Sequence, residues 1–182
     1  MLPAVTTGPP LHDALDYHLR CAVLDWTGHD DGTVGALLQG VGAFPKLHGV
    51  LYTAAAWAAL VTGDDNTAKR LWAELRAEPV GAHARLTGRT VVPVYRYRLI
   101  ERWGTRTEAE QGRANLEPLS GKWAGDPLLA LGPVDLTLAR YSRLLDDHER
   151  ADREFHQARR QALARGLHRW VERIDVASEI GW

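Results

Sequence analysis

The chain has 182 residues, of which 45% are hydrophobic and 25% are charged, and its formal net charge is -1. This composition predicts a globular protein with one sizeable core, and it excludes a strongly basic chain that would attract nucleic acid or anionic lipid as a whole. The single cysteine, Cys21, excludes disulfides within the chain and multi-cysteine metal sites. No run reaches the roughly 18 apolar residues that a membrane span needs, and the N-terminus lacks a signal-peptide pattern. We therefore expect a cytoplasmic protein that contacts neither membranes nor nucleic acid directly.

The N-terminal part of the chain is predicted to form four helices. Apolar residues recur three and four positions apart over about 11–27, which is typical of an amphipathic helix. A second helix at about 33–43 contains several glycines and ends before Pro45. Two more are expected at about 46–62, which is rich in alanine, and at about 65–77.

The C-terminal part is predicted to contain five more helices, which makes about nine in an all-α fold. A polar loop at 78–88 precedes the segment RTVVPVYRYRLIERW at 89–103. Its β-branched residues favour a strand, but its apolar spacing suits a helix that starts at Pro93, and no partner strand is evident elsewhere. We therefore expect a helix there. Further helices are expected at about 106–117, 133–146, 148–165 and 167–180. The glycine- and proline-rich segment 120–133 is expected to be a long loop between them.

An internal repeat organises these helices. The residues at the turns between paired helices are Gly28, Gly63, Gly104 and Asp146, at separations of 35, 41 and 42 residues. Five residues after the last three of these turns stands an alanine (Ala68, Ala109, Ala151), and nine residues after two of them stands an aromatic residue (Trp72, Phe155). The third pair has Arg113 at the aromatic position. A small residue lets the second helix approach the first closely, and the aromatic residue fills the space between successive pairs.

This pattern resembles the tetratricopeptide repeat, and residues 63–79 and 144–158 carry the resemblance best. The resemblance implies one domain, 1–182, in which antiparallel helical hairpins stack as a right-handed solenoid. The expected hairpins lie at about 11–43, 46–77, 90–117 and 133–165, followed by a capping helix at 167–180.

The C-terminal half is similar, more narrowly, to the terminal repeat region of large actinobacterial ATP-binding regulators with LuxR-type or SARP-type DNA-binding domains. The similarity is carried by Leu116 to Pro118, by Gly132 to Asp135 and by Trp170. The chain departs from that family at Asp146, where a glycine is usual, and it carries no ATPase or DNA-binding module. It is therefore expected to be a segment of a larger regulator or a free-standing relative.

Clusters of acidic residues and histidines mark the predicted turns. Asp146, Asp147, His148 and Glu149 stand where acidic residues cap the following helix, and we prefer this interpretation to a metal or acid-base site. The pair formed by His29 and Asp30 leaves a metal-dependent HD-type hydrolase as an alternative, although no third histidine stands at a partner spacing. Phosphate-binding loops, dinucleotide fingerprints and nucleophile elbows are missing from the sequence. We expect no catalytic residue, metal ion or cofactor.

The candidate binding residues lie on the first helix of each hairpin, because these helices line the concave surface of a stacked array. They are Trp26, Trp57, Arg98, Arg102, Arg140 and Arg143. Arginine presents a fork of donors to carboxylates or phosphates, and tryptophan presents rigid apolar area. In the alternative interpretation the tryptophans fill space between hairpins and the arginines form a solvated face.

The sequence thus predicts a non-enzymatic interaction module, regulatory or scaffolding, that binds a protein or peptide partner, possibly an acidic one, in its groove. A ligand-sensing segment of a bacterial transcriptional regulator, with a small molecule in the same groove, is the first alternative. The hydrolase built on His29 and Asp30 is the second.

Overall fold

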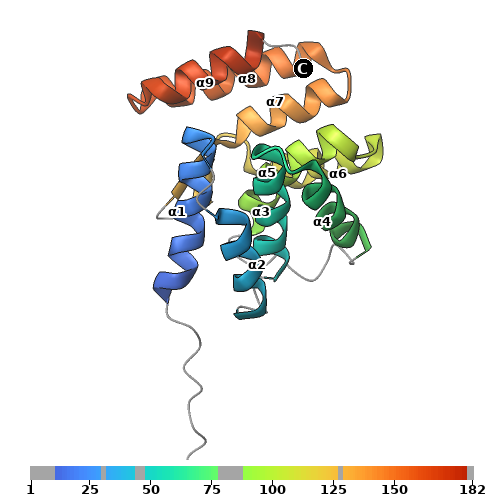
Figure 1. Ribbon diagram of the computed structural model, residues 1–182. Helices are drawn as coiled ribbons and strands as arrows, with labels where there is room; N and C mark the ends of the chain where they lie inside the picture. The colour runs from blue at the N-terminus through green and yellow to red at the C-terminus, as the bar shows by residue number, and fades with distance from the viewer. Residues whose placement is uncertain (1–10, 30–31, 44–47, 78–87, 127–128, 180–182) are drawn as a thin grey trace, which may run out of the picture. The chain divides into compact units, whose positions relative to one another are not determined.

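The computed structural model describes residues 11–29, 32–43, 48–77, 88–126 and 129–179. Helices dominate these residues, as predicted, and a two-stranded sheet accompanies them (Figure 1). The nine α-helices in the described part of the chain are α1 (Leu11–Thr27), α2 (Thr33–Ala43), α3 (His48–Val61), α4 (Asp65–Ala77), α5 (Gly88–Trp103), α6 (Arg106–Leu116), α7 (Val134–Leu144), α8 (His148–Ala164) and α9 (His168–Glu179). The chain divides into two compact units, Met1–His83 (unit 1) and Ala84–Trp182 (unit 2). The single domain expected over 1–182 stays a prediction.

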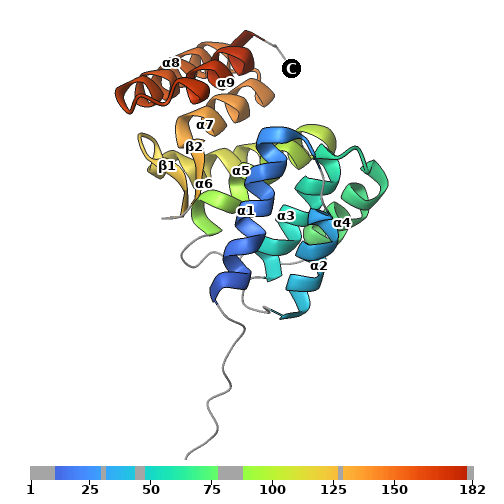
Figure 2. The same cartoon turned by 60° about the vertical axis from the view of Figure 1, so that its left-hand side comes forward.

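In unit 1, α3 is the central helix, because it packs against α1, α2 and α4 (Figure 2). Nearly all side chains between positions 49 and 59 are buried, and the many alanines among them let the neighbouring helices approach closely. Gly63, with φ +84°, makes the turn into α4. The carboxylate of Asp64 then accepts a hydrogen bond from the backbone N–H of Thr67 at 3.0 Å, and hydrogen bonding to Thr67 lowers the pKa of Asp64. Asp64 is therefore the residue that caps α4.

In unit 2, each helix from α5 to α9 packs against the next helix along the chain. The helix expected to start at Pro93 begins earlier, at Gly88, so that Pro93 lies inside α5. The prediction of a later start was wrong because Val91, Tyr95 and Leu99, spaced four apart, bury one face of the longer helix. The carbonyl oxygen of Pro93 accepts a hydrogen bond from the buried Tyr141 hydroxyl at 3.1 Å, which ties α5 to α7.

The segment 120–133 is not the long loop that its glycines and prolines predict. It contains strand β1 (Trp123–Asp126), which pairs antiparallel with strand β2 (Leu129–Pro133), with a bulge between Ala124 and Gly125. A short 3₁₀ helix, η2 (Glu117–Leu119), precedes the hairpin. The expectation failed because the two strands within the segment pair with each other. It also failed because a glycine of the second strand is required by close packing against α9, and not by a loop conformation.

That glycine is Gly132, which has φ +102°. A Cβ atom on it would lie 2.5 Å from a ring carbon of Trp170 on α9, so only glycine fits between the strand and the ring. The rings of Trp123 and Trp170 then meet edge to face, with centroids 6.0 Å apart. The β-hairpin is therefore a packed part of unit 2 that braces α9.

Burial follows the repeat register. All three predicted alanines are buried, and so are both predicted aromatic residues: Ala68, Trp72, Ala109, Ala151 and Phe155. Asp146 adopts the left-handed conformation, with φ +64°, which a glycine would adopt at this turn without strain. The packing part of the register is thereby confirmed, whereas the stacking of the hairpins as a right-handed solenoid stays a prediction.

Arg113, at the position where the other pairs have an aromatic residue, is buried in a polar network. Its guanidinium pairs with the carboxylate of Glu154 on α8 and donates from Nε to Ser142 Oγ on α7 at 3.1 Å. Ser142 Oγ in turn donates to the other carboxylate oxygen of Glu154 at 2.7 Å. Three helices are joined here by charge-assisted hydrogen bonds, at the position where the other two pairs have an aromatic residue.

Candidate binding cleft

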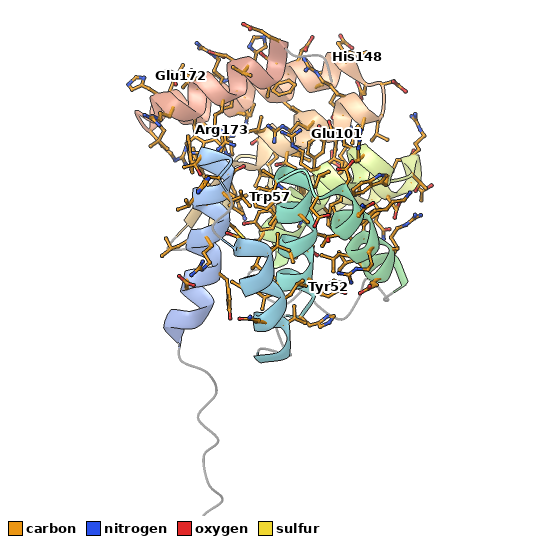
Figure 3. The ribbon with its side chains drawn as sticks, viewed as in Figure 1. Tyr52, Trp57, Glu101, His148, Glu172 and Arg173 are labelled. Atoms are coloured by element: carbon orange, nitrogen blue, oxygen red, sulfur yellow. The ribbon has the colours of Figure 1, made fainter. Side chains whose placement is uncertain are left out.

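Unit 2 contains an open cleft of about 310 Å³ to which four helices contribute. Helices α5 and α9 lie on opposite sides of α7 (Figure 1). Figure 3 labels Glu101 on α5, and Glu172 and Arg173 on α9. The lining residues are Tyr97 and Arg98 from α5, Arg140, Arg143 and Leu144 from α7, Phe155 from α8, and Glu172, Arg173, Val176 and Ala177 from α9.

The lining combines positive charge with apolar surface. Four of the ten residues are arginines, and a single glutamate, Glu172, opposes them. The other five are Tyr97, Leu144, Phe155, Val176 and Ala177, of which Tyr97 and Phe155 are buried. A partner that fits this lining carries negative charge beside an apolar group.

The cleft brings together three of the four predicted arginines: Arg98, Arg140 and Arg143. Arg102 is exposed near the C-terminal end of α5 and is not among the lining residues. The two predicted tryptophans belong to unit 1. Trp57 is only 4% exposed, which favours the interpretation that it fills space in the core, whereas Trp26 is 42% exposed. The cleft thus retains Arg98 of α5 and Arg140 and Arg143 of α7, and it adds residues from α8 and α9.

Arg143 holds the end of α9. Its two terminal nitrogens donate hydrogen bonds to the backbone carbonyl oxygens of Ala177 and Ser178, at 2.8 and 2.6 Å. Its guanidinium carbon also lies 4.5 Å from the ring centroid of Phe155. A positive charge at the C-terminal end of a helix satisfies its last carbonyl groups and complements the helix dipole. Arg143 was predicted to be a binding residue, but its hydrogen bonds attach the end of α9 to α7 and so stabilise one side of the cleft.

Tyr97 organises the α5 side of the cleft. Its hydroxyl donates to a carboxylate oxygen of Glu101 at 2.6 Å, while Arg98 pairs with the other oxygen at 3.4 Å. The guanidinium of Arg140 stands over the Tyr97 ring, with its carbon 5.5 Å from the centroid. Burial raises the pKa of Tyr97 well above its usual range, and the nearby Glu101 carboxylate raises it further. Tyr97 therefore stays neutral and acts as a hydrogen-bond donor and an aromatic platform.

Arg173 is the arginine of the cleft that the sequence did not predict as a binding residue. Its guanidinium carbon lies 5.0 Å from the centroid of a Trp170 ring, one turn earlier on α9. The helix at 167–180 was predicted to be a capping helix, and for that reason no binding residue was expected on α9. The spacing of Trp170, Arg173 and Val176, three residues apart on one helical face, was the available signal.

The turn that precedes α8 is built as a helix cap. The carboxylate of Asp147 accepts a hydrogen bond from the backbone N–H of Arg150 at 3.1 Å, and the exposed Asp146 pairs with Arg106 at 3.5 Å. Of the pair on which the hydrolase alternative rests, His29 is exposed and Asp30 lies outside the described residues. Within the residues that are described, no three His, Cys, Asp or Glu side chains are grouped closely enough to hold a metal ion.

No protein-family model, curated protein or solved structure matches the chain. Among the helices of the described ranges, none is both long enough and apolar enough to cross a membrane.

Proposed function

We propose that the chain is a non-enzymatic, tetratricopeptide-like interaction module that binds a protein or peptide partner in the cleft of unit 2. The lining of the cleft carries this proposal. Arginine and aromatic residues dominate the binding energy of protein interfaces, and here four arginines surround Tyr97 and Phe155. The repeat register supports the proposal as well, since stacked helical hairpins offer extended binding surfaces. The resemblance to repeat regions of actinobacterial regulators favours a regulatory role in the cytoplasm.

A small-molecule sensor is the second candidate, and the size of the cleft favours it. About 310 Å³ lies at the lower end of the range of small-molecule sites, which is roughly 300 to 1,000 Å³. The cleft is open, however, and its α9 side includes the exposed side chains of Glu172 and Val176, of which Val176 is 52% exposed. An open site with a partly exposed wall suits a segment that continues beyond the cleft better than an enclosed ligand.

Site-specific photo-crosslinking tests the proposal. A photoreactive phenylalanine analogue replaces Val176 at the cleft in one variant and Leu163 on α8 in another, and both are expressed in the source organism. Leu163 is 45% exposed and does not line the cleft, which makes it a matched control. We expect a defined protein product from position 176 that position 163 does not give, and its yield should fall in the Arg173→Gln background. The same products from both positions would contradict the proposal, and a small-molecule adduct confined to position 176 would favour the sensor.

A further inference from the structure

We propose that the cleft of unit 2 in one copy of the chain binds helix α1 of a second copy. This inference rests on the proposed function, because it names the protein partner of the same cleft. The contact is heterologous, since it joins two different surfaces of the same chain.

Helix α1 has an apolar face that is exposed. Leu19, Val23 and Trp26 are spaced four and three residues apart, so they share one side of the helix, and they are 56%, 50% and 42% exposed. Cys21 and Leu24, on the other side, are only 1% and 0% exposed, and α1 packs against α2 and α3. The helix is thus apolar on two sides, and unit 1 buries one of them.

The exposed apolar side chains are clustered. Seven large apolar side chains are exposed in the ranges that the structure describes. Three of them form the exposed face of α1, and a fourth, Val176, lines the cleft. A single exposed apolar side chain is ordinary, whereas a contiguous patch marks an interaction surface. Four of the seven therefore lie on the two surfaces that we propose to meet.

The two units carry net charges of opposite sign. Residues 1–83 contain 5 lysines and arginines and 9 aspartates and glutamates, which gives a formal net charge of -4 with neutral histidines. Residues 84–182 contain 17 and 14, which gives +3. These values count every charged side chain, so ion pairs within a unit do not change them. Opposite charges steer the acidic unit of one copy towards the basic unit of another.

The charges of the two proposed surfaces have the same signs as those of their units. Helix α1 contains three aspartates and one arginine, and the cleft is lined by four arginines and one glutamate. Asp16 lies three residues before Leu19, on the exposed side of α1; its side chain is 53% exposed and pairs with Arg20 at 2.7 Å. Helix α1 therefore supplies negative charge beside an apolar face, which is the combination that the lining of the cleft fits.

The size of the cleft sets how α1 would dock. A helix with its side chains is roughly 10 to 12 Å wide, and a cleft of about 310 Å³ admits side chains but not a whole helix. We expect α1 to lie across the opening and to insert apolar side chains of its exposed face, as in other complexes between an amphipathic helix and a groove.

Sedimentation velocity of the full chain, from about 1 μM to about 1 mM, tests the inference. We expect association that increases with concentration and weakens as salt is added, because salt screens the opposite charges. A chain that stays monomeric, or association that salt does not weaken, would overturn the inference. Photo-crosslinking from position 176 would then still test the proposed function, so the two failures are distinguishable.

Two variants disrupt one surface each. Val23→Arg places a positive charge opposite the arginines of the cleft, and Val176→Glu places a negative charge opposite α1. Both side chains are about half exposed, so neither change enters the core. Each variant should weaken self-association at least about tenfold. The charge-matched controls, Val61→Arg on α3 and Leu163→Glu on α8, alter exposed side chains outside both surfaces and should change it less than about twofold.

A mixture of the two variants distinguishes the proposed contact from a symmetrical one. The Val23→Arg chain keeps an intact cleft and the Val176→Glu chain keeps an intact α1, so the mixture should associate more tightly than either variant alone. A mixture that associates no better than its components would overturn the inference. Loss of association in Val23→Arg but not in Val176→Glu would also overturn it, since α1 would then pair with α1 of the second copy.

Discussion

Glu154 holds together the buried polar network of α6, α7 and α8, and its removal should cost more stability than the removal of its partner. The side chains of Arg113 and Glu154 are only 8% and 14% exposed. In Glu154→Leu, the buried guanidinium of Arg113 retains its hydrogen bond to Ser142 Oγ at 3.1 Å. The carboxylate that remains near it is that of the exposed Glu117, at 3.4 Å. Breaking a buried pair from one side in this way costs about 3 to 5 kcal/mol.

Removal of Arg113 instead leaves the charge of Glu154 with two of its partners. In Arg113→Met, the Glu154 carboxylate keeps the Ser142 hydroxyl at 2.7 Å and Arg150 at 3.3 Å, so we expect a loss of about 1 to 3 kcal/mol. The double variant should recover part of the summed loss, because two apolar side chains of similar volume replace the pair without leaving an uncompensated charge.

Urea unfolding of the wild type, both single variants and the double variant measures these differences as a double-mutant cycle. The control is Arg153→Met, which removes an exposed arginine of α8 whose pair with Glu149 spans 3.6 Å and should matter little. Strictly additive losses, or a larger loss from Arg113→Met than from Glu154→Leu, would refute the account of the network.

The remaining predictions concern packing and backbone conformation. Phe155→Ala should lower the free energy of unfolding by about 3 to 5 kcal/mol, because a large buried ring leaves a cavity; an unchanged thermal midpoint would remove the support for the register. Gly132→Ala should destabilise the protein by more than about 1 kcal/mol, because alanine is strained at φ +102° and its Cβ would meet Trp170, and a neutral result in thermal unfolding would contradict the packing of the hairpin. Asp146→Gly should raise stability by up to about 1 kcal/mol, since glycine adopts φ +64° without strain, and a loss in urea unfolding would show that the pair with Arg106 matters more.

Periodicity predicted the helices well, because an amphipathic helix leaves its spacing in the sequence regardless of its partners. It also located Ala151 and Phe155 in the core, since a small residue and a ring at those offsets have few other uses in a helical pair. The β-hairpin was missed because the glycine of β2 is dictated by the ring of Trp170, and a contact between distant positions leaves no local pattern.

The binding surface was predicted in part for the same reason. Arg98 and Arg140 occupy equivalent positions on the first helices of their hairpins, each six residues before the turn. The repeat register was therefore enough to predict that they share one surface. The part played by Arg143 depends on where α9 ends, and the inclusion of Arg173 depends on α9 packing beside α8. The spacing of Trp170, Arg173 and Val176 shows that they share a helical face, but it does not show what that face packs against. Trp57 was predicted to bind because tryptophan is a common anchor at interfaces, but tertiary packing buries its side chain in the core.

The central claim is that the cleft of unit 2 is the binding surface, and NMR observation of arginine side chains tests it most directly. The partner captured through position 176 is added to ¹⁵N-labelled protein, and the Nε–Hε resonances are assigned by single arginine-to-lysine variants. The account predicts that the resonances of Arg140 and Arg173 shift strongly on binding while that of Arg160 does not. Shifts confined to arginines of unit 1, such as Arg20 or Arg70, or equal shifts at Arg160 and Arg173, would contradict it.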